Sequence, residues 1–332
     1  MTTIKEVSEL AGVSQATVSR VMNSSERVAD ATRRKVKAAM LELGYQPNSA
    51  AQSLASNRSN TIGMVVASLD GPFYGPVMSG VEEELRGRNK HLIIASGHGQ
   101  AQQEQEAISF LSSRQVDGLI LLTESVDADY LKGLNARIPI YLINQHIDGL
   151  ESRNMWLDNE GGCYAATQYL ISMGHSQIVC AGGQSYKQDA NERVSGFIKA
   201  MTEAGLAVSE GSIVRTVFEF SGGLHAMQQF TASGLPFTAV VAGNDEMAIG
   251  IYEWAAQHKI RIPEDLSVIG FDDVLMANYV KPRLTTMNFP AYEMARTSAR
   301  MALDEVYAKR PPKGMEFKPN LVIRDSVRDL NA

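Results

Sequence analysis

The sequence predicts a small three-helix head followed by a larger α/β body, in which parallel sheets flanked by helices form two lobes. The chain has 332 residues, about twice the size of a typical domain, so more than one folded unit is expected. Apolar residues recur at helical spacing over the first 45 positions, whereas short β-branched runs alternate with helical segments from Thr61 onward. The charge is also unevenly divided, because residues 1–60 carry a net +3 and the remainder −9. A basic head on an acidic body favours a nucleic-acid contact confined to the head.

Composition excludes several classes of protein. With 44% hydrophobic and 20% charged residues, the chain lies near the average for globular proteins and far from disordered or collagen-like ones. No segment approaches the roughly 20 apolar residues of a membrane-spanning helix. The start, Met1-Thr2-Thr3-Ile4-Lys5-Glu6, lacks the pattern of a signal peptide, so a cytoplasmic protein without a membrane partner is expected. Cys163 and Cys180 have no metal-ligand spacing and are expected to be buried thiols, and no metal or other cofactor is expected.

The head begins with two short helices separated by a tight turn. Thr3 and Glu6 have the spacing of a capping box at the start of the first helix, and Gly12 ends that helix. Ser14 can cap a second helix, and a third is expected to end at Gly44. Three short helices with a glycine in the turn between the first two are typical of a helix-turn-helix domain.

The second helix has the side chains that read DNA in such a domain. Gln15, Ala16 and Arg20 suit base edges in the major groove, because Gln pairs with adenine, Arg pairs with guanine and Ala contacts the thymine methyl group. Ser14, Thr17 and Ser19 suit phosphate contacts, which position the helix without specifying the sequence. The alternative from spacing alone is a small helical bundle with a solvated polar face.

The sequence of the body predicts repeated βαβ units. Buried strands are predicted at residues 62–67, 92–95, 118–122, 140–143, 178–181, 239–242 and 266–269. Helical segments separate them, so parallel sheets covered on both faces are expected. About 270 residues of this pattern favour two lobes with a cleft at the carboxyl ends of the strands, where such sheets bind small molecules.

The head and the start of the segment that follows it resemble a known family. Ala11-Gly12-Val13-Ser14, Thr17-Val18-Ser19-Arg20-Val21 and Gly44-Tyr45-Gln46-Pro47-Asn48 resemble the DNA-binding signature of the LacI/GalR family of bacterial transcription regulators. The resemblance implies a hinge helix over about 48–56 that orders on DNA, with Leu54 wedged into the minor groove. The domains are therefore expected at 1–47 (head), 48–60 (hinge and linker) and 61–332 (effector binding and dimerisation). With the residues that the family motifs add, the predicted DNA contacts are Thr3, Ser14, Gln15, Ala16, Thr17, Ser19, Arg20, Asn23, Asn48, Ala51, Leu54 and Ala55.

The resemblance extends over the body, to the periplasmic-binding-protein-like fold that the family carries. Its landmarks include Asn191-Glu192-Arg193, Gly243-Asn244-Asp245-Glu246 and Val268-Ile269-Gly270-Phe271-Asp272-Asp273. The stretches Gly270-Phe271-Asp272-Asp273-Val274-Leu275 and Pro282-Arg283-Leu284-Thr285-Thr286 together look closest to the galactose-repressor branch. Such bodies cross between lobes three times. One lobe is therefore expected at about 62–160 plus 290–323 and the other at about 161–289.

The predicted ligand-binding residues suit a neutral polyol. Arginine, aspartate and asparagine side chains can each make several hydrogen bonds to hydroxyls, and aromatic rings cover the apolar face of a sugar. One aromatic is expected from Phe73 or Tyr74 and one from Phe218 or Phe220. The set is Asp70, Phe73, Tyr74, Asn144, Arg193, Phe218, Phe220, Asn244, Asp272 and Phe289. His175 follows Gly174 at a helix end and is expected to be a cap or a dipole partner.

The expected function is sequence-specific DNA binding by a homodimeric transcription regulator. The resemblance favours a repressor of sugar-utilisation genes that binds a near-palindromic operator in double-stranded DNA and responds to galactose or a galactoside, with a nucleoside or purine as the alternative effector. The competing function is a cytosolic sugar-binding or sugar-processing protein with an incidental helical amino end. Catalytic motifs are lacking, because the sequence has no G-x-S-x-G, H-E-x-x-H or P-loop pattern, so an enzyme is not expected.

Overall fold

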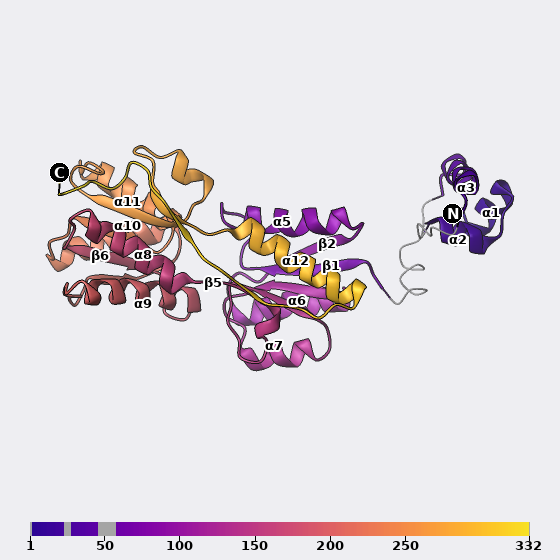
Figure 1. Cartoon of the computed structure of the whole chain (residues 1–332), viewed down its shortest axis with the longest axis horizontal. Helices are drawn as coiled ribbons and strands as arrows, with labels where there is room; N and C mark the ends of the chain where they lie inside the picture. Colours follow the sequence, from indigo (N-terminus) through magenta and orange to yellow (C-terminus); the bar gives the residue numbers. More distant parts are fainter. Residues whose placement is uncertain (1, 23–27, 46–57, 332) are drawn as a thin grey trace. The chain divides into compact units, whose positions relative to one another are not determined.

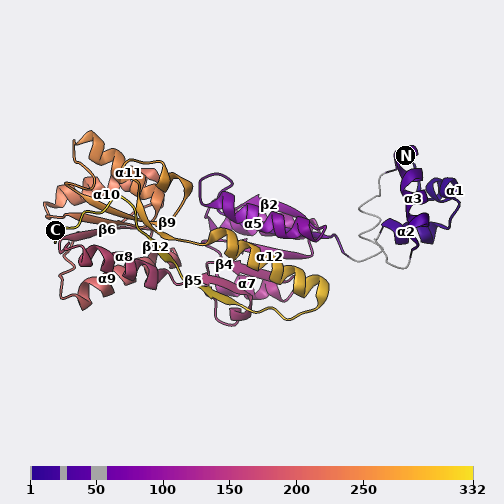
Figure 2. The same cartoon turned by 45° about the horizontal axis from the view of Figure 1, so that its top comes forward.

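The structure divides between Asn60 and Thr61 into a helical head and an α/β body. It is a computed structural model that describes residues 2–22, 28–45 and 58–331 (Figures 1 and 2). None of the helices in these ranges combines the length and the apolar character that a bilayer crossing requires.

The head contains α1 (Ile4–Ala11), α2 (Gln15–Met22) and α3 (Asp30–Glu42). The capping box at α1 is confirmed, because the Thr3 hydroxyl accepts the Glu6 N–H and the Glu6 carboxylate accepts the Thr3 N–H at 2.7 Å. Gly12 ends α1 with a φ of 66°, a left-handed conformation that glycine adopts without steric cost. The turn to α2 is therefore tight, as the sequence predicts.

A single valine core holds the three helices of the head together. Val7, Val18 and Val36 come from α1, α2 and α3 in turn, and each is fully buried. Because a helix has a period of 3.6 residues, burying Val18 and Val21 on one side of α2 turns the opposite side outward. The helix-turn-helix arrangement expected from the sequence is present.

The body contains two six-stranded sheets. The strand orders are β11-β5-β4-β3-β1-β2 and β12-β10-β9-β8-β6-β7, and every pairing is parallel except that of β12 with β10. The first sheet consists of β1 (Thr61–Val66), β2 (His91–Ser96), β3 (Gly118–Leu122), β4 (Ile140–Ile143), β5 (Asn154–Leu157) and β11 (Met315–Phe317). The second consists of β6 (Ile178–Gly182), β7 (Ile213–Arg215), β8 (Ala239–Ala242), β9 (Ser267–Asp272), β10 (Thr285–Asn288) and β12 (Asn320–Val322).

The seven strands predicted from apolar runs are present, and their interiors explain why the runs are continuous. Every residue of β3, β4, β6, β8 and β9 is buried, since helices cover both faces of each sheet. The five strands that the sequence did not predict, β5, β7, β10, β11 and β12, are short, and each contains at least one polar residue.

Helices pair across the outer faces of the sheets. Around the first sheet lie α5 (Tyr74–Gly87), α6 (Ala101–Ser113), α7 (Ala128–Asn135) and α12 (Ala291–Ala308), and around the second lie α8 (Asn159–Ser172), α9 (Gln188–Glu203), α10 (Phe220–Ser233) and α11 (Asp245–Gln257). The most extensive helix pairs are α5 with α12, α8 with α9, and α10 with α11 (Figure 1). Gly80 allows the first of these contacts, because a Cβ there would lie 2.5 Å from the carbonyl oxygen of Tyr292.

The chain passes between the lobes three times, after β5, after β10 and after β11. The first lobe therefore returns from α12 through β11, whereas β12 pairs with β10 in the second sheet. The expected range 290–323 is thus too long at its carboxyl end. Three residues of β12 were assigned to the wrong lobe because an apolar pair such as Leu321-Val322 suits either sheet.

Candidate DNA-reading helix and effector site

The outward side of α2 presents the predicted base-reading side chains. Gln15, Ala16 and Arg20 are exposed, whereas Thr17 and Ser19 are half-buried. The Ser14 hydroxyl accepts the Thr17 N–H at 3.1 Å and lies 2.9 Å from the Thr17 hydroxyl, so it caps the helix as expected. An exposed α2 N-terminal turn with an arginine one turn later is the geometry that a major groove accepts.

Of the other predicted DNA contacts, the structure describes only Thr3. Thr3 is engaged locally, since its hydroxyl lies 2.9 Å from the Glu6 carboxylate, to which it donates. The remaining predicted contacts, Asn23, Asn48, Ala51, Leu54 and Ala55, lie outside the described residues and stay predictions.

In the body, the predicted ligand-binding residues follow the carboxyl ends of the strands. Asp70, Phe73 and Tyr74 come after β1, Asn144 after β4, Phe218 after β7, Asn244 after β8, Phe289 after β10, and Asp272 is the last residue of β9. The carboxyl ends of parallel strands share one edge of a sheet. Since β1 and β4 belong to the first sheet and β7 to β10 belong to the second, both lobes contribute residues to this set. We call the group formed by Phe73, Arg193, Phe218, Asn244 and Asp272 the strand-end cluster.

Arg193 is the centre of the strand-end cluster. It lies on α9, is 4% exposed, and donates from Nε to Asn159 at 3.0 Å and from Nη1 to the Gly243 carbonyl at 2.6 Å. Its guanidinium carbon lies 3.8 Å from the centroid of the Phe271 ring and 5.4 Å from that of Phe218. A planar cation held by hydrogen bonds and ring faces is fixed in orientation.

Asp272 faces this guanidinium. Its Oδ1 lies 3.3 Å from Arg193 Nη2 without hydrogen-bond geometry and has no hydrogen-bond partner among the described residues. Burial raises the pKa of Asp272 to about 7, and the neighbouring carboxylates of Asp189 and Glu246 raise it while Arg193 opposes the shift. The site therefore contains a buried acceptor that the protein itself leaves unsatisfied.

The structure separates the predicted aromatic alternatives at Phe218 and Phe220. Phe218 contacts Arg193 and lies 5.4 Å from the Lys187 ammonium, measured to the ring centroid. Phe220 begins α10 and is 43% exposed, with no described contact to the cluster. The other aromatics pack edge to face, with ring centroids 5.4 Å apart for Phe73 and Tyr74 and 5.0 Å apart for Phe73 and Phe289.

Two predicted hydrogen-bonding residues are occupied within the protein. Asn244 caps α11 by accepting the Met247 N–H at 2.9 Å and donates to the Phe218 carbonyl at 3.2 Å. Asn144 donates to Asp189 of the other lobe at 3.3 Å. Both side chains therefore position neighbouring elements of the site.

An ion pair that the sequence did not predict joins the lobes beside the cluster. Lys187, which precedes α9, lies 2.7 Å from the carboxylate of Glu124, which follows β3, and their side chains are 13% and 19% exposed. Glu104 holds the Glu124 loop, since it accepts the N–H groups of Glu124, Ser125 and Val126. Nothing in the sequence pairs two oppositely charged residues 63 positions apart, so only the fold reveals this contact.

Other sequence expectations have clear outcomes. Cys163 and Cys180 are free and buried, as predicted. His175 is buried, and its backbone N–H donates to the Leu170 carbonyl at 3.1 Å, so it caps the end of α8 as expected. Its ring contacts Thr238 Oγ1 at 2.8 Å and the Arg328 carbonyl at 3.2 Å, which ties the carboxyl-terminal segment to the second lobe. No group of metal-ligating side chains occurs in the ranges that the structure describes.

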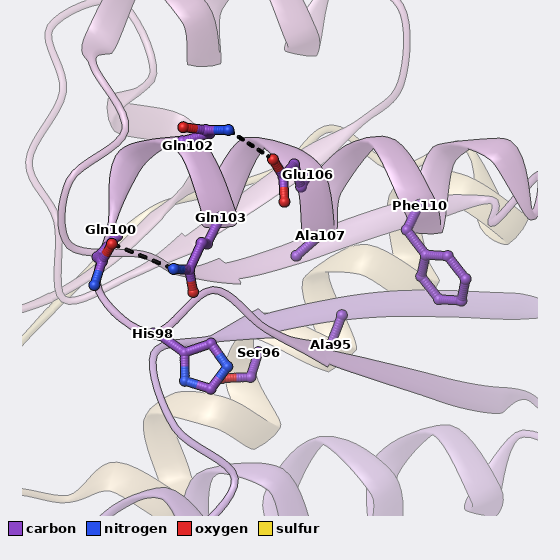
Figure 3. Close-up of a pocket in the computed structure, with 9 residues that line it drawn as sticks. All are labelled: Ala95, Ser96, His98, Gln100, Gln102, Gln103, Glu106, Ala107 and Phe110. Atoms are coloured by element: carbon purple, nitrogen blue, oxygen red, sulfur yellow. Dashed lines mark hydrogen bonds between the residues drawn. The ribbon is translucent and has the colours of Figure 1, made fainter.

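A surface groove lies elsewhere on the first lobe. It has a volume of about 550 Å³ and runs between β2 and α6, from His98 and Gln100 to Phe110 (Figure 3). Gln102 donates to Glu106 and Gln103 donates to Gln100, so its polar side chains pair among themselves. The groove contains none of the predicted ligand-binding residues.

Comparisons with known proteins assign the family. Residues 3–48 match the model of bacterial regulatory proteins of the lacI family, and residues 167–327 match a periplasmic binding protein-like domain. The transcriptional regulator GalR of Escherichia coli (strain K12) is 38% identical over 330 residues, 98% of this chain and 96% of GalR. The transcriptional repressor PurR of Photobacterium profundum is 36% identical over 334 residues, the whole of both chains.

Solved structures agree with this assignment. The lac repressor dimer bound to operator and the anti-inducer ONPF matches with a TM-score of 0.87 and 26% identity, over 98% of this chain and 99% of that one. The complex of the transcriptional regulator CelR with cellobiose matches with a TM-score of 0.74 and 30% identity, over 98% of this chain and all of that one. The chain belongs to the lacI family of bacterial regulatory proteins.

Proposed function

We propose that this chain is a transcriptional repressor that binds an operator through its head and a small polyol through its body. The exposed set Gln15, Ala16 and Arg20 on α2, over a fully buried valine core, is the observation that carries DNA reading. The names of the relatives GalR and PurR support repression or regulation of transcription as the outcome of that binding.

The strand-end cluster is the proposed effector site. The unsatisfied Asp272 oxygen, held beside Arg193, offers a directional hydrogen-bond acceptor, and Phe218 offers an aromatic ring, which together suit a compact polyhydroxylated ring. Galactose or a galactoside is favoured by the resemblance to GalR at 38% identity. A nucleoside or purine is the second candidate, favoured by PurR at 36%.

We place the domain boundaries at 1–47, 48–60 and 61–332, and we propose that two copies associate through the body in the cytoplasm. The head alone has one reading helix, and a near-palindromic operator presents two equivalent half-sites, so a symmetric pair of heads matches the DNA. The lac repressor dimer bound to operator supports this assembly. Effector and operator then affect each other's affinity by the same factor, because linkage is reciprocal.

The reading function is tested with Arg20→Ala. Duplexes selected from a random pool by the full chain define the operator, and gel shifts then measure affinity for that site and for single-base variants. Loss of the guanine contact should cost about 1–3 kcal/mol at the selected site and relax preference at one symmetric base position. Lys5→Ala, which removes an exposed α1 cation beside Glu9, is the control and should leave base preference unchanged. Equal weakening on all sequences would assign Arg20 to phosphate.

A further inference from the structure

The charges around the strand-end cluster limit what kind of ligand can enter. Carboxylates from both lobes surround it: Asp70 and Glu124 come from the first lobe, and Asp189, Glu246 and Asp272 come from the second. Burial is the largest cause of the raised pKa values of Glu246 and Asp272, and neighbouring carboxylates add to it: Asp70 and Glu219 raise the pKa of Glu246, and Asp189 and Glu246 raise that of Asp272. Any negatively charged group that enters the site meets the same repulsion.

The cations of the same region are already engaged. Lys187 is paired with Glu124 at 2.7 Å. Arg193 donates to Asn159 and to the Gly243 carbonyl, and its third nitrogen lies 3.3 Å from Asp272 Oδ1, an ion pair without hydrogen-bond geometry. Arg215, the next cation along the edge of the sheet, donates to the carbonyls of Gly183 and Ala190. An incoming anion would have to displace one of these contacts to gain a cationic partner.

Helix N-termini, which often bind anions, are also occupied by the protein's own acceptors. Asp189, in the first turn of α9, accepts the Ala190 N–H at 2.8 Å. Asn244 accepts the Met247 N–H at the start of α11, and that helix carries Asp245 and Glu246 in its first turn. The positive ends of both helix dipoles are thus already neutralised.

One buried polar atom of the cluster lacks a hydrogen-bond partner. The Oδ1 atom of Asp272 is buried without a hydrogen bond among the described residues, in a side chain that is 7% exposed. In its ionised form, the Asp272 carboxylate accepts from a hydroxyl or an ammonium donor and repels a phosphate or a second carboxylate. The acceptor chemistry of Asp272 and the negative charge around it therefore both favour a ligand that carries no negative charge.

We propose that the effector of this chain carries no negative charge: the site binds an uncharged or amino-bearing polyol and excludes sugar phosphates and sugar acids. The inference rests on the proposed effector function and narrows it. Asp189 and Glu246 act as specificity-determining residues, because each adds negative charge to the site without a cationic partner in the contacts described above.

The test uses matched sets of uncharged and charged ligands with the full chain, of which the galactose set is matched in size. Thermal melts first compare galactose, galactosamine and galacturonate, then ribose with ribose 5-phosphate, and inosine with inosine 5′-monophosphate, since a ligand of the native state raises the melting temperature. Titration calorimetry then gives Kd within the responding set. We expect the anionic member to bind at least tenfold more weakly than its uncharged counterpart, and galacturonate differs from galactose too little in size for steric exclusion.

Variants separate charge from shape. Glu246→Gln and Asp189→Asn, singly and together, should narrow the gap between the anion and its uncharged counterpart, whereas Glu253→Gln, an identical change two turns along α11, should leave it unaltered. Equal or tighter binding of an anionic member to the wild-type chain would overturn the inference and leave the effector function standing. A panel with no binder at all would contradict the effector function itself.

Discussion

Asp272 ends β9 in a backbone conformation that most residues avoid. Its φ is 107°, and Asp273 follows with a φ of 56°, so two non-glycine residues in succession take positive values. Such conformations cost on the order of 1–3 kcal/mol each and persist only where the surroundings impose them. Here the turn directs the Asp272 carboxylate toward Arg193, while Asp273 pairs with Arg324 at 2.6 Å. The strained turn therefore lets two adjacent aspartates contact two different arginines.

The raised pKa of Asp272 predicts a pH dependence of stability. The folded body keeps a proton on this carboxyl up to a pH of about 7, whereas the unfolded chain loses it near 3.8, so the folded state binds more protons between these values. The contribution of Asp272 to the free energy of unfolding is therefore present at low pH and falls as the pH rises through this window.

Denaturant unfolding at pH 4.5 to 8 checks this with Asp272→Asn. The wild-type chain should lose stability relative to the variant as the pH rises. The control is Asp265→Asn, whose carboxyl is held at a pKa of about 2 by hydrogen bonds from Arg261 and should give a constant difference over the same range. Parallel curves for the wild type and Asp272→Asn would refute a raised pKa in the folded body.

At the scale of elements, the α5–α12 contact shows how much depends on one missing side chain. A Cβ at Gly80 would lie 2.5 Å from the Tyr292 carbonyl oxygen and 3.2 Å from the Ala295 Cβ. The first of these neighbours is backbone, so the helices can accommodate a methyl group only by moving apart. Helix packing in the first lobe thus depends on a residue with poor intrinsic helix propensity.

Gly80→Ala is therefore expected to destabilise the body by about 1–3 kcal/mol, through overpacking between two helices. Gly87→Ala, on the same helix but with no atom within 4 Å of the new Cβ, is the matched control. It should be neutral or stabilise by about 0.4–1 kcal/mol, because alanine restricts the unfolded chain. Chemical denaturation followed by far-UV circular dichroism measures both. Similar changes in the free energy of unfolding for the two variants would show that α5 and α12 accommodate a methyl group between them.

The whole body depends on contacts between its lobes. Lys187 and Glu124 meet at 2.7 Å, and Asn144 and Asp189 meet at 3.3 Å beside them. Each pair has one member on each lobe, so the angle between the lobes determines whether these contacts form. This makes the two pairs reporters of lobe closure.

Charge reversal tests that role. Lys187→Glu should open the lobes of the effector-free chain by repulsion from Glu124, and Glu124→Lys should do the same, whereas the double reversal should restore closure. The coupling between the two positions is expected to be about 0.5–3 kcal/mol, as for residues in direct contact. Small-angle scattering gives the radius of gyration of each variant, and denaturation gives the coupling energy. Additive effects in the double variant would show that the pair does not join the lobes.

The sequence predicted the strands and helices that follow from a local pattern of apolar residues. It missed the contacts between residues that lie far apart in the chain. The buried strands β3, β4, β6, β8 and β9 were predictable because helices on both faces require continuous apolar runs. Strand β10 was not, because its polar residues Thr285 and Thr286 are buried with hydrogen bonds from the Thr285 N–H to Ser326 and from the Thr286 hydroxyl to Asp245. Arg193, Phe218 and Asp272 were predicted and lie together. Lys187 and Glu124 were missed because no local pattern marks a contact between lobes.

The three lobe crossings determine how the protein responds to being cut. Because the chain passes between lobes after β5, after β10 and after β11, neither lobe is one continuous segment. A protease that cleaves a single crossing produces two fragments that still share a sheet, so non-covalent packing keeps a nicked molecule together under native conditions and the fragments separate only when it is denatured. A gene fragment ending at any one crossing encodes an incomplete sheet. Neither lobe can therefore be inherited or exchanged as a single uninterrupted stretch of DNA.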